Sequence, residues 1–273
     1  MKGGMMSDGK RQTEINASGV PLLEFDPDRT ALIEPSHSSR FNPKMPERVV
    51  ICFPNNALQK YAQEKSLPVI SHLACESARY PVYLAEFESI PVALAHPGVG
   101  APLAAGLLEE LIAMGGKKFV ACGGCGVLDR ELAVGHLLVP SSAVRDEGTS
   151  YHYLPPGREV EASAKAVEGI GRCLEKENVP YKVIKTWTTD GVFRETKGKI
   201  ALRKSEGCLS VEMEAAALFA VGKFRKVDVG LILYAGDDVS GETWDHRDWQ
   251  DRGDVRTGLL ELAIRAVAGM KSG

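Results

Sequence analysis

The stretch Ser210-Val-Glu-Met-Glu-Ala-Ala-Ala-Leu-Phe-Ala220 joins two carboxylates to a run of strong helix formers. Glu212 and Glu214 are two residues apart, so on an extended segment both side chains point to the same face. The alanine-rich run favours a helix, and acidic side chains near a helix start are stabilised by its dipole. A functional interpretation is equally open: a carboxylate beside the Met213 thioether could bind the hydroxyls and ring of a sugar.

The composition is that of a globular protein. The chain has 273 residues, of which 44% are hydrophobic and 25% are charged, which is enough for one large core and favours a single α/β domain. The formal net charge of -3 shows no excess of basic residues of the kind that binds nucleic acid. No apolar run approaches the roughly 18 residues of a membrane span. We therefore expect neither nucleic acid nor a membrane as a partner.

We expect residues 1–36 to form a partly disordered N-terminal arm ahead of a catalytic domain at 37–273. Residues 1–20 are polar and rich in glycine and serine, and they lack the apolar segment of a signal peptide. Six cysteines in a chain of this length are too few for a disulfide scaffold. A reducing cytoplasm is therefore the expected location.

Cys122-Gly-Gly-Cys125 has the spacing of a metal-binding or redox pair. A zinc site would need a second such pair or histidines at ligand spacing, and neither follows in the sequence. We therefore interpret this segment as a glycine-rich turn after a buried strand, and we expect no metal.

Short β-branched runs alternate with helical segments along the chain. Such alternation predicts a largely parallel sheet with helices on both faces, and ligands bind such sheets where strands end in loops. Unusual loops follow four expected strands, at 97–98, 123–126, 212–214 and 236–238. The expected strands are 47–53, 80–85, 90–96, 117–122, 136–142, 181–188 and 229–234, and the expected helices are 57–64, 102–114, 161–178, 199–206 and 255–270.

Four segments together resemble the nucleoside phosphorylase family, over residues 49–270. They are Val211-Glu-Met-Glu214, Gly98-Val-Gly-Ala-Pro102, Gly123-Gly-Cys-Gly126 and Val144-Arg-Asp-Glu-Gly-Thr-Ser-Tyr-His-Tyr153. The resemblance implies an α/β fold: a three-layer α/β/α domain around a twisted mixed sheet that is partly barrel-like. It also implies homodimers, often assembled into hexamers, with each site shared between subunits.

The resemblance implies cleavage of an N-glycosidic bond and assigns roles to single residues. Asp237 lies at the family's distance from the motif, 23 residues beyond Glu214, and would be the acid that protonates the base. That role needs a raised pKa, which the adjacent Asp238 would support. Ribose would be bound by Glu214, Met213, Glu212 and a partner subunit's copy of His37, and the base by Phe193, Cys125 and Gly126.

The phosphate site departs from the family pattern. The family's Gly-Asp-Pro loop and its arginine are replaced by Pro54-Asn-Asn-Ala-Leu58, a strand arginine by Ala121, and a hydroxyl donor by Gly124. Phosphate recognition depends on charge-assisted, often bidentate contacts, so several of them are missing together. The remaining candidates for holding phosphate or water are Gly98, Gly124 and Arg79, with Arg40 and Arg48 as further substitutes.

The sequence predicts phosphorolysis of a purine or pyrimidine nucleoside to free base and ribose 1-phosphate, with inorganic phosphate as co-substrate and no cofactor. Two alternatives stay open: hydrolysis with water as nucleophile, and nucleoside binding without turnover. The base also stays open. Asp237 favours purines and Arg194-Glu-Thr-Lys-Gly198 lacks the family's uridine signature, whereas Tyr151-His-Tyr153 is similar to the uridine phosphorylases.

Overall fold

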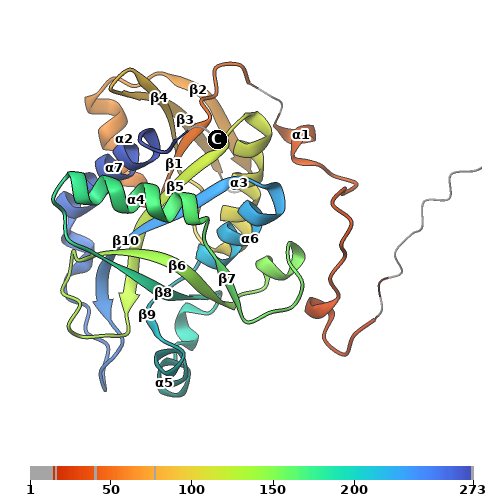
Figure 1. Ribbon diagram of the computed structural model, residues 1–273, viewed down its shortest axis with the longest axis vertical. Helices are drawn as coiled ribbons and strands as arrows, with labels where there is room; N and C mark the ends of the chain where they lie inside the picture. Colours follow the sequence, from red (N-terminus) through yellow and green to blue (C-terminus); the bar gives the residue numbers. More distant parts are fainter. Residues whose placement is uncertain (1–14, 16, 40–41, 77, 272–273) are drawn as a thin grey trace, which may run out of the picture.

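The computed structural model describes residues 15, 17–39, 42–76 and 78–271 (Figure 1). Strands and helices alternate along most of the chain. The strands are β1 Arg48–Cys52, β2 Val69–Cys75, β3 Ala78–Phe87, β4 Ile90–Ala95, β5 Lys118–Val127, β6 Leu137–Asp146, β7 Glu159–Glu161, β8 Tyr181–Thr189, β9 Cys208–Glu212 and β10 Asp228–Asp238. The helices are α1 Pro35–Ser38, α2 Asn55–Glu64, α3 Ala101–Met114, α4 Ala164–Lys176, α5 Lys197–Ser205, α6 Ala215–Arg225 and α7 Gly253–Ala268, with 3-10 turns η1 Pro21–Leu23, η2 Thr149–His152, η3 Val192–Arg194 and η4 Trp249–Asp251.

The sheet is mixed and part of it closes into a barrel. Its strand order is β10-β6-β8-β9-β5-β1-β4-β3-β2, with β7 beside β6, and β10 also pairs with β5. This last pairing joins β5, β9, β8, β6 and β10 in a ring. Strands β10, β5, β1 and β4 run parallel, whereas β9 is antiparallel to β5 and β6 is antiparallel to β10. The predicted three-layer fold with a twisted, partly barrel-like mixed sheet is confirmed.

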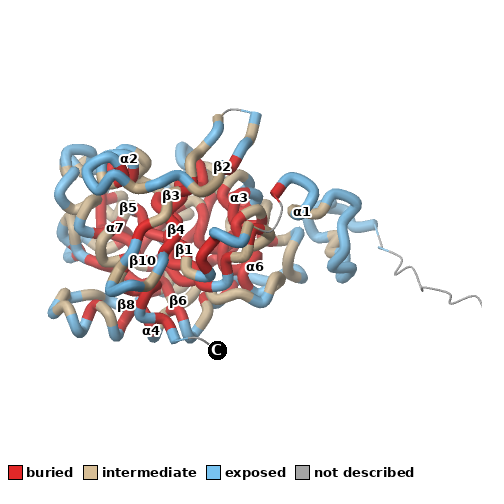
Figure 2. The backbone as a smooth tube through the Cα atoms, turned by 90° about the horizontal axis from the view of Figure 1, so that it is seen from above, coloured by how far each residue is buried: buried red, intermediate tan, exposed pale blue. Residues whose placement is uncertain are grey.

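The alternation of side chains along each strand divides the core between two helical layers. On β1, Val49 and Ile51 belong to the cluster that contains the apolar residues of α3 and α6, and Val50 and Cys52 belong to the cluster of α4 and α7. Successive side chains of a strand point to opposite faces, so each face needs its own cover. Figure 1 shows α4 and α7 together on one side of the sheet and α3 and α6 on the other. Figure 2 shows the buried backbone concentrated in the central strands between them.

The glycine-rich turn expected at 123–126 and the loop expected at 236–238 are wrong: both segments are strand. Strand β5 continues to Val127 and β10 to Asp238, with Gly124 opposite Tyr234 and Gly126 opposite Val211. Closing the barrel supplies backbone partners for these glycines, which overrides their turn preference. Strand β2 is not predicted from the sequence, since most of its residues stay partly exposed and show no apolar alternation.

The cysteines of the CxxC spacing lie in different packing environments. Cys122 belongs to the cluster of α4 and α7, in register with Cys52 of the neighbouring strand, whereas Cys125 belongs to the cluster of α3 and α6. Three residues apart on a strand, they point to opposite faces. In the part of the chain that the structure describes, no group of three or more His, Cys, Asp or Glu side chains is arranged to hold a metal ion.

The N-terminal segment runs along the outside of α3 and α6 (Figure 1). Arg225 of α6 bridges it to the body, with contacts of 3.6 Å to Glu34 and 2.6 Å to Glu109, and the Arg29 guanidinium lies over the Phe224 ring. Residues 1–14 and 16 of the expected disordered arm lie outside the described residues. Arg40, which was suggested as a phosphate ligand, lies outside them as well. None of the helices described here combines the length and apolar character of a membrane crossing.

Candidate active site

A cavity of about 780 Å³ opens where β1, β5, β9 and β10 reach their C-terminal ends. This edge is where α/β sheets bind ligands. Most of the residues expected at the site share this cavity, although they come from distant parts of the sequence. Those lining it are Gly124, Cys125, Gly126, Phe193, Glu212, Met213, Glu214 and Asp237.

Glu212 caps the start of α6. One carboxylate oxygen accepts hydrogen bonds from the amides of Glu214 at 2.7 Å and Ala215 at 2.6 Å. The other accepts from the Thr188 hydroxyl at 2.6 Å, and that hydroxyl oxygen in turn accepts from the Ala216 amide at 2.9 Å. Burial, together with the Glu214 charge, raises the pKa of Glu212 to about 8. The side chain therefore fixes the turn that carries Met213 and Glu214, as a helix cap does.

Glu214 reaches across the cavity to the start of α3. Its carboxylate accepts a hydrogen bond of 2.6 Å from the Gly100 amide, and Gly100 has a φ of 92°, which favours glycine. Burial raises the pKa of Glu214 to about 6. Gly98, which we expected at the phosphate, lies in the same turn, next to the cavity-lining Val99. The two carboxylates of the motif thus fix two different helix starts at one cavity.

Asp237 lies at the end of β10 and is half-buried. Its carboxylate accepts a hydrogen bond of 2.7 Å from the indole of Trp244. A Cβ atom at Gly126 would lie 3.0 Å from a Val211 methyl and 3.6 Å from an Asp237 oxygen. Only glycine at 126 therefore leaves the carboxylate open to a ligand from this side.

Asp238 does not accompany Asp237, because it bonds elsewhere. It lies 2.7 Å from the Arg247 guanidinium and accepts the Ser240 amide at 2.7 Å. Against the effect of burial, Ser240 and then Arg247 lower the pKa of Asp238. The carboxylate whose pKa responds to the charge of Asp237 is that of Glu195, which the sequence did not single out.

Glu195 is half-buried in the cavity wall. Among the described residues it has no hydrogen bond or ion pair, and burial followed by the Asp237 charge raises its pKa to about 7. The signal that could have found it is its place two residues after Phe193, the aromatic expected at the base. A carboxylate in a cavity without a protein partner can accept hydrogen bonds from water or from a ligand that replaces it.

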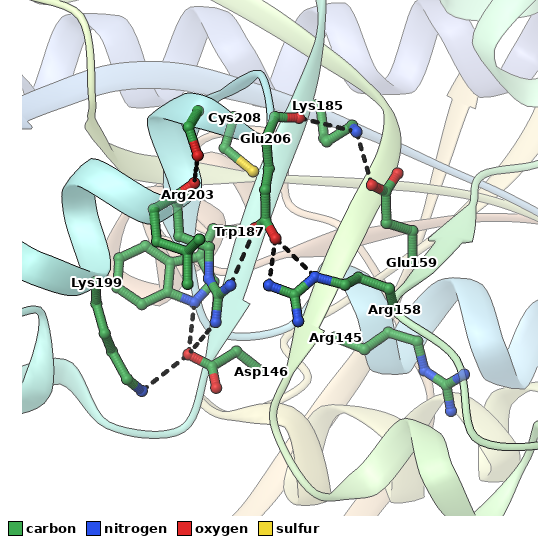
Figure 3. Close-up of polar contacts among 12 residues, drawn as sticks. Arg145, Asp146, Arg158, Glu159, Lys185, Trp187, Lys199, Arg203, Glu206 and Cys208 are labelled. Atoms are coloured by element: carbon green, nitrogen blue, oxygen red, sulfur yellow. Dashed lines mark hydrogen bonds and ion pairs between the residues drawn. The ribbon is translucent and has the colours of Figure 1, made fainter.

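The segment that carries Phe193 and Glu195 is anchored by a charged network under α5. Asp146 lies 2.9 Å from Lys199, 3.1 Å from Arg203 and 2.9 Å from the indole nitrogen of Trp187. Figure 3 shows these side chains converging on Asp146, and Arg203 also binding Glu206. Because α5 and the turn before it form one wall of the cavity, this network holds that wall on β6 and β8.

Three further candidates lie away from the cavity of the single chain. His37 is on α1, where it is exposed and its ring accepts the Glu34 amide at 3.2 Å. Arg79 is exposed on β3. Arg48 lies at the N-terminal end of β1, opposite to the cavity, and donates to the Met270 carbonyl at 3.2 Å. Phe193 does line the cavity, at its rim, with 95% of its surface exposed.

The charge of the cavity is predominantly acidic. Glu195, Glu212, Glu214 and Asp237 line it without an ion pair among the residues described. Of the two basic residues in its wall, Lys197 is paired with Glu242. Arg256 of α7 is the other, and it has no ion pair with any described residue.

Comparison with known proteins places these features in one family. The phosphorylase superfamily model matches residues 47–268. A guanosine phosphorylase of Halorubrum lacusprofundi is 24% identical over 206 residues, which are 73% of this chain and 85% of that protein. A uridine phosphorylase of Treponema pallidum is 30% identical over 232 residues, 78% of this chain and 84% of that one. The solved uridine phosphorylase of Vibrio fischeri has the same fold, with a TM-score of 0.70, 22% identity and coverage of 88% of this chain and 98% of the other. The chain belongs to the phosphorylase superfamily.

Proposed function

We propose that the protein cleaves the N-glycosidic bond of a purine nucleoside and transfers the sugar to inorganic phosphate. One observation carries this proposal: the carboxylate of Glu214 and the thioether of Met213, which suit a sugar, line the same cavity as the acid Asp237 and the aromatic Phe193. The guanosine and uridine phosphorylases among the relatives support it. A phosphate oxygen forms the new bond to C1′ while the bond from C1′ to the base nitrogen breaks. The electron pair leaves with the base, which takes a proton.

Glu214 is suited to the sugar. Its carboxylate accepts hydrogen bonds from ribose hydroxyls, and above its pKa of about 6 its charge favours the oxocarbenium-like state of the departing sugar. The Gly100 amide holds the carboxylate without cancelling its charge. Met213 supplies an apolar contact for the ring.

Asp237 and Glu195 are suited to a purine. Burial, followed by the Asp237 charge, raises the pKa of Glu195 to about 7, so this side chain carries a proton part of the time at neutral pH and can supply it to the leaving base. An ionised Glu195 accepts N–H donors, which guanine offers as N1–H and its 2-amino group. We therefore propose a 6-oxopurine nucleoside, guanosine above inosine, in preference to uridine.

Hydrolysis is the second candidate, and the acidic cavity is the observation that favours it. Those carboxylates of the cavity that are ionised at neutral pH repel a phosphate dianion, whereas water carries no charge. The family's arginine positions are occupied by Leu58 and Ala121. Water as nucleophile would need no replacement for them.

The test is base release from guanosine, inosine, adenosine and uridine, followed by chromatography with and without phosphate. We expect guanine and hypoxanthine, together with ribose 1-phosphate, only when phosphate is present. Base release at the same rate without phosphate selects hydrolysis. Absence of base from every nucleoside in both buffers contradicts the proposal.

The proposal includes a cofactor-free homo-oligomer in the cytoplasm. His37 and Arg79 lie outside the cavity of one chain, so a neighbouring copy would have to supply them. Light scattering gives the solution mass, and His37→Ala should raise the KM for nucleoside without changing that mass. A monomer with full activity contradicts the shared site.

A further inference from the structure

We propose that Tyr234 and Arg256 form the phosphate-binding subsite of this cavity, in place of the family's missing arginines. The inference rests on the proposed phosphorolysis and names the residues that would hold its co-substrate. The ligand is an oxyanion of the size and charge of inorganic phosphate.

Arg256 carries the positive charge that the subsite needs. It lies in the first turns of α7, is half-buried and lines the cavity. Its guanidinium donates to the Tyr234 hydroxyl at 3.1 Å and to the Trp249 carbonyl at 3.3 Å, but it has no ion pair with any described residue. A guanidinium held by neutral acceptors keeps its full charge, and its remaining N–H groups can bind two oxygens of one phosphate.

Tyr234 supplies the hydroxyl. Its ring is 1% exposed, yet it borders the cavity, opposite Gly124 on the neighbouring strand. A Cβ atom at Gly124 would lie 2.9 Å from the Tyr234 oxygen. The tyrosine hydroxyl therefore occupies the space into which a hydroxyl-bearing side chain at 124 would extend, which explains the glycine there.

The Tyr234 hydroxyl is oriented to donate. Its oxygen accepts the hydrogen bond from Arg256, so its own proton is free for another acceptor. Burial raises the pKa of this phenol, and it stays protonated at neutral pH. An anion bound here receives one neutral and one charged donor, both held before it arrives.

The position also fits the sheet. Gly124 lies on β5, between Tyr234 on β10 and Phe53, whose amide donates to the Cys122 carbonyl where β1 ends. Strand β1 ends at this part of the cavity, beside β5 and β10, which continue past it, and Phe53 and Pro54 also line it. Proline has no amide hydrogen, so the segment after β1 cannot bind the anion through the backbone of that residue.

Two variants and one control test the subsite. Tyr234→Phe removes one oxygen, and Arg256→Gln removes the charge while keeping a polar side chain. Arg252→Gln is the matched control: Arg252 precedes α7 on the same segment, is also half-buried, and does not line the cavity. Circular dichroism and thermal melting check that each variant is folded.

We expect the KM for phosphate to rise about tenfold or more in Tyr234→Phe and Arg256→Gln, since hydrogen bonds to charged groups are worth about 1.5–3 kcal/mol. The KM for guanosine should change by less than about twofold, and Arg252→Gln should match the wild type. Calorimetric titration with inorganic phosphate alone should show binding to the wild type and Arg252→Gln and weaker binding to both cavity variants.

The outcomes separate this inference from the proposed function. If phosphate-dependent base release persists in both variants with an unchanged KM for phosphate, the subsite is wrong and the proposed function stands. If the wild type releases base without phosphate and binds no phosphate in the calorimeter, the subsite is wrong and hydrolysis is selected. If the wild type releases no base, the proposed function fails, and the phosphate titrations of the three variants still decide the subsite.

Discussion

The motif Glu212–Glu214 and the pair Tyr234–Arg256 serve one cavity but hold their functional groups in different ways. The carboxylates are fixed by backbone amides at the starts of α6 and α3. Tyr234 and Arg256 are fixed by a hydrogen bond between side chains of β10 and α7. Functional groups that are fixed by backbone amides close to them in the chain form a contiguous sequence motif. Groups that are fixed by a side chain distant in the chain form no such motif. The first kind can therefore be found in the sequence, whereas the second kind is found only in the structure.

The largest effect should come from Asp237→Asn. Asparagine keeps the shape and the hydrogen bond from Trp244 but cannot give a proton to the base, and general acids contribute about 10²–10⁴-fold to rates. We expect kcat for guanosine to fall within that range. Asp248→Asn, an exposed carboxylate on the same loop, is the control. A loss of less than about threefold would exclude Asp237 as the acid.

Glu214→Gln should follow in size and tests the motif. Loss of the charge that faces the sugar should lower kcat/KM for guanosine by about 100-fold, as for other electrostatic groups at a reacting centre. If Glu214 binds the 2′-hydroxyl, 2′-deoxyguanosine should lose less. Equal losses of kcat/KM on the two nucleosides would show that Glu214 does not bind the 2′-hydroxyl and acts on the 3′-hydroxyl or on the charge of the transition state.

Glu195→Gln should have a smaller effect, concentrated on the base. We expect kcat/KM for guanosine to fall about tenfold, the value of one charge-assisted hydrogen bond, with a smaller fall for inosine. Because an ionised Glu195 accepts with both oxygens and more strongly than the protonated acid, substrate binding by the wild type should strengthen as pH rises through about 7, and the glutamine variant should lack this rise. An unchanged guanosine-to-inosine ratio would remove Glu195 from base recognition.

The smallest effect concerns stability and Glu212. The folded pKa of about 8 exceeds the reference value of 4.5, so the folded protein binds this proton more tightly than the unfolded chain. The resulting stabilisation is complete below about pH 4.5 and is lost as pH rises through about 8. Relative to Glu212→Gln, which does not titrate, the wild type should lose melting temperature over this range. A constant difference from pH 5 to pH 9 would show that the hydrogen bonds from Thr188 and the two amides keep Glu212 ionised.

Much of the fold followed from local sequence. The helix expected at 102–114 matches α3, and the apolar runs at 117–122 and 229–234 lie in β5 and β10. The barrel was expected only through the resemblance, since pairing of β10 with β5 joins residues more than 100 positions apart. That pairing also turned the expected glycine turns into strand.

The site divides in the same way. Glu212, Met213, Glu214 and Asp237 were named from the sequence and line one cavity. Glu195 was missed because its raised pKa depends on burial in the folded chain and then on Asp237, 42 positions away. Arg256 was missed because the sequence of α7 shows only the pattern of an ordinary amphipathic helix. The hydrogen bond that places its guanidinium at the cavity comes from Tyr234 on β10. The parts that a partner subunit would supply, His37 and Arg79, cannot be judged from one chain.

The barrel has a consequence for aggregation. By joining β10 to β5, it closes that end of the strand order, whereas β2, at the other end, pairs among the described strands with β3 alone. Val69 is 47% exposed at the start of β2, and an exposed strand edge is a template for another strand. Concentrated or partly unfolded protein should therefore associate first through residues 69–75, and a lysine in place of Val69 should lengthen its storage life without touching the cavity.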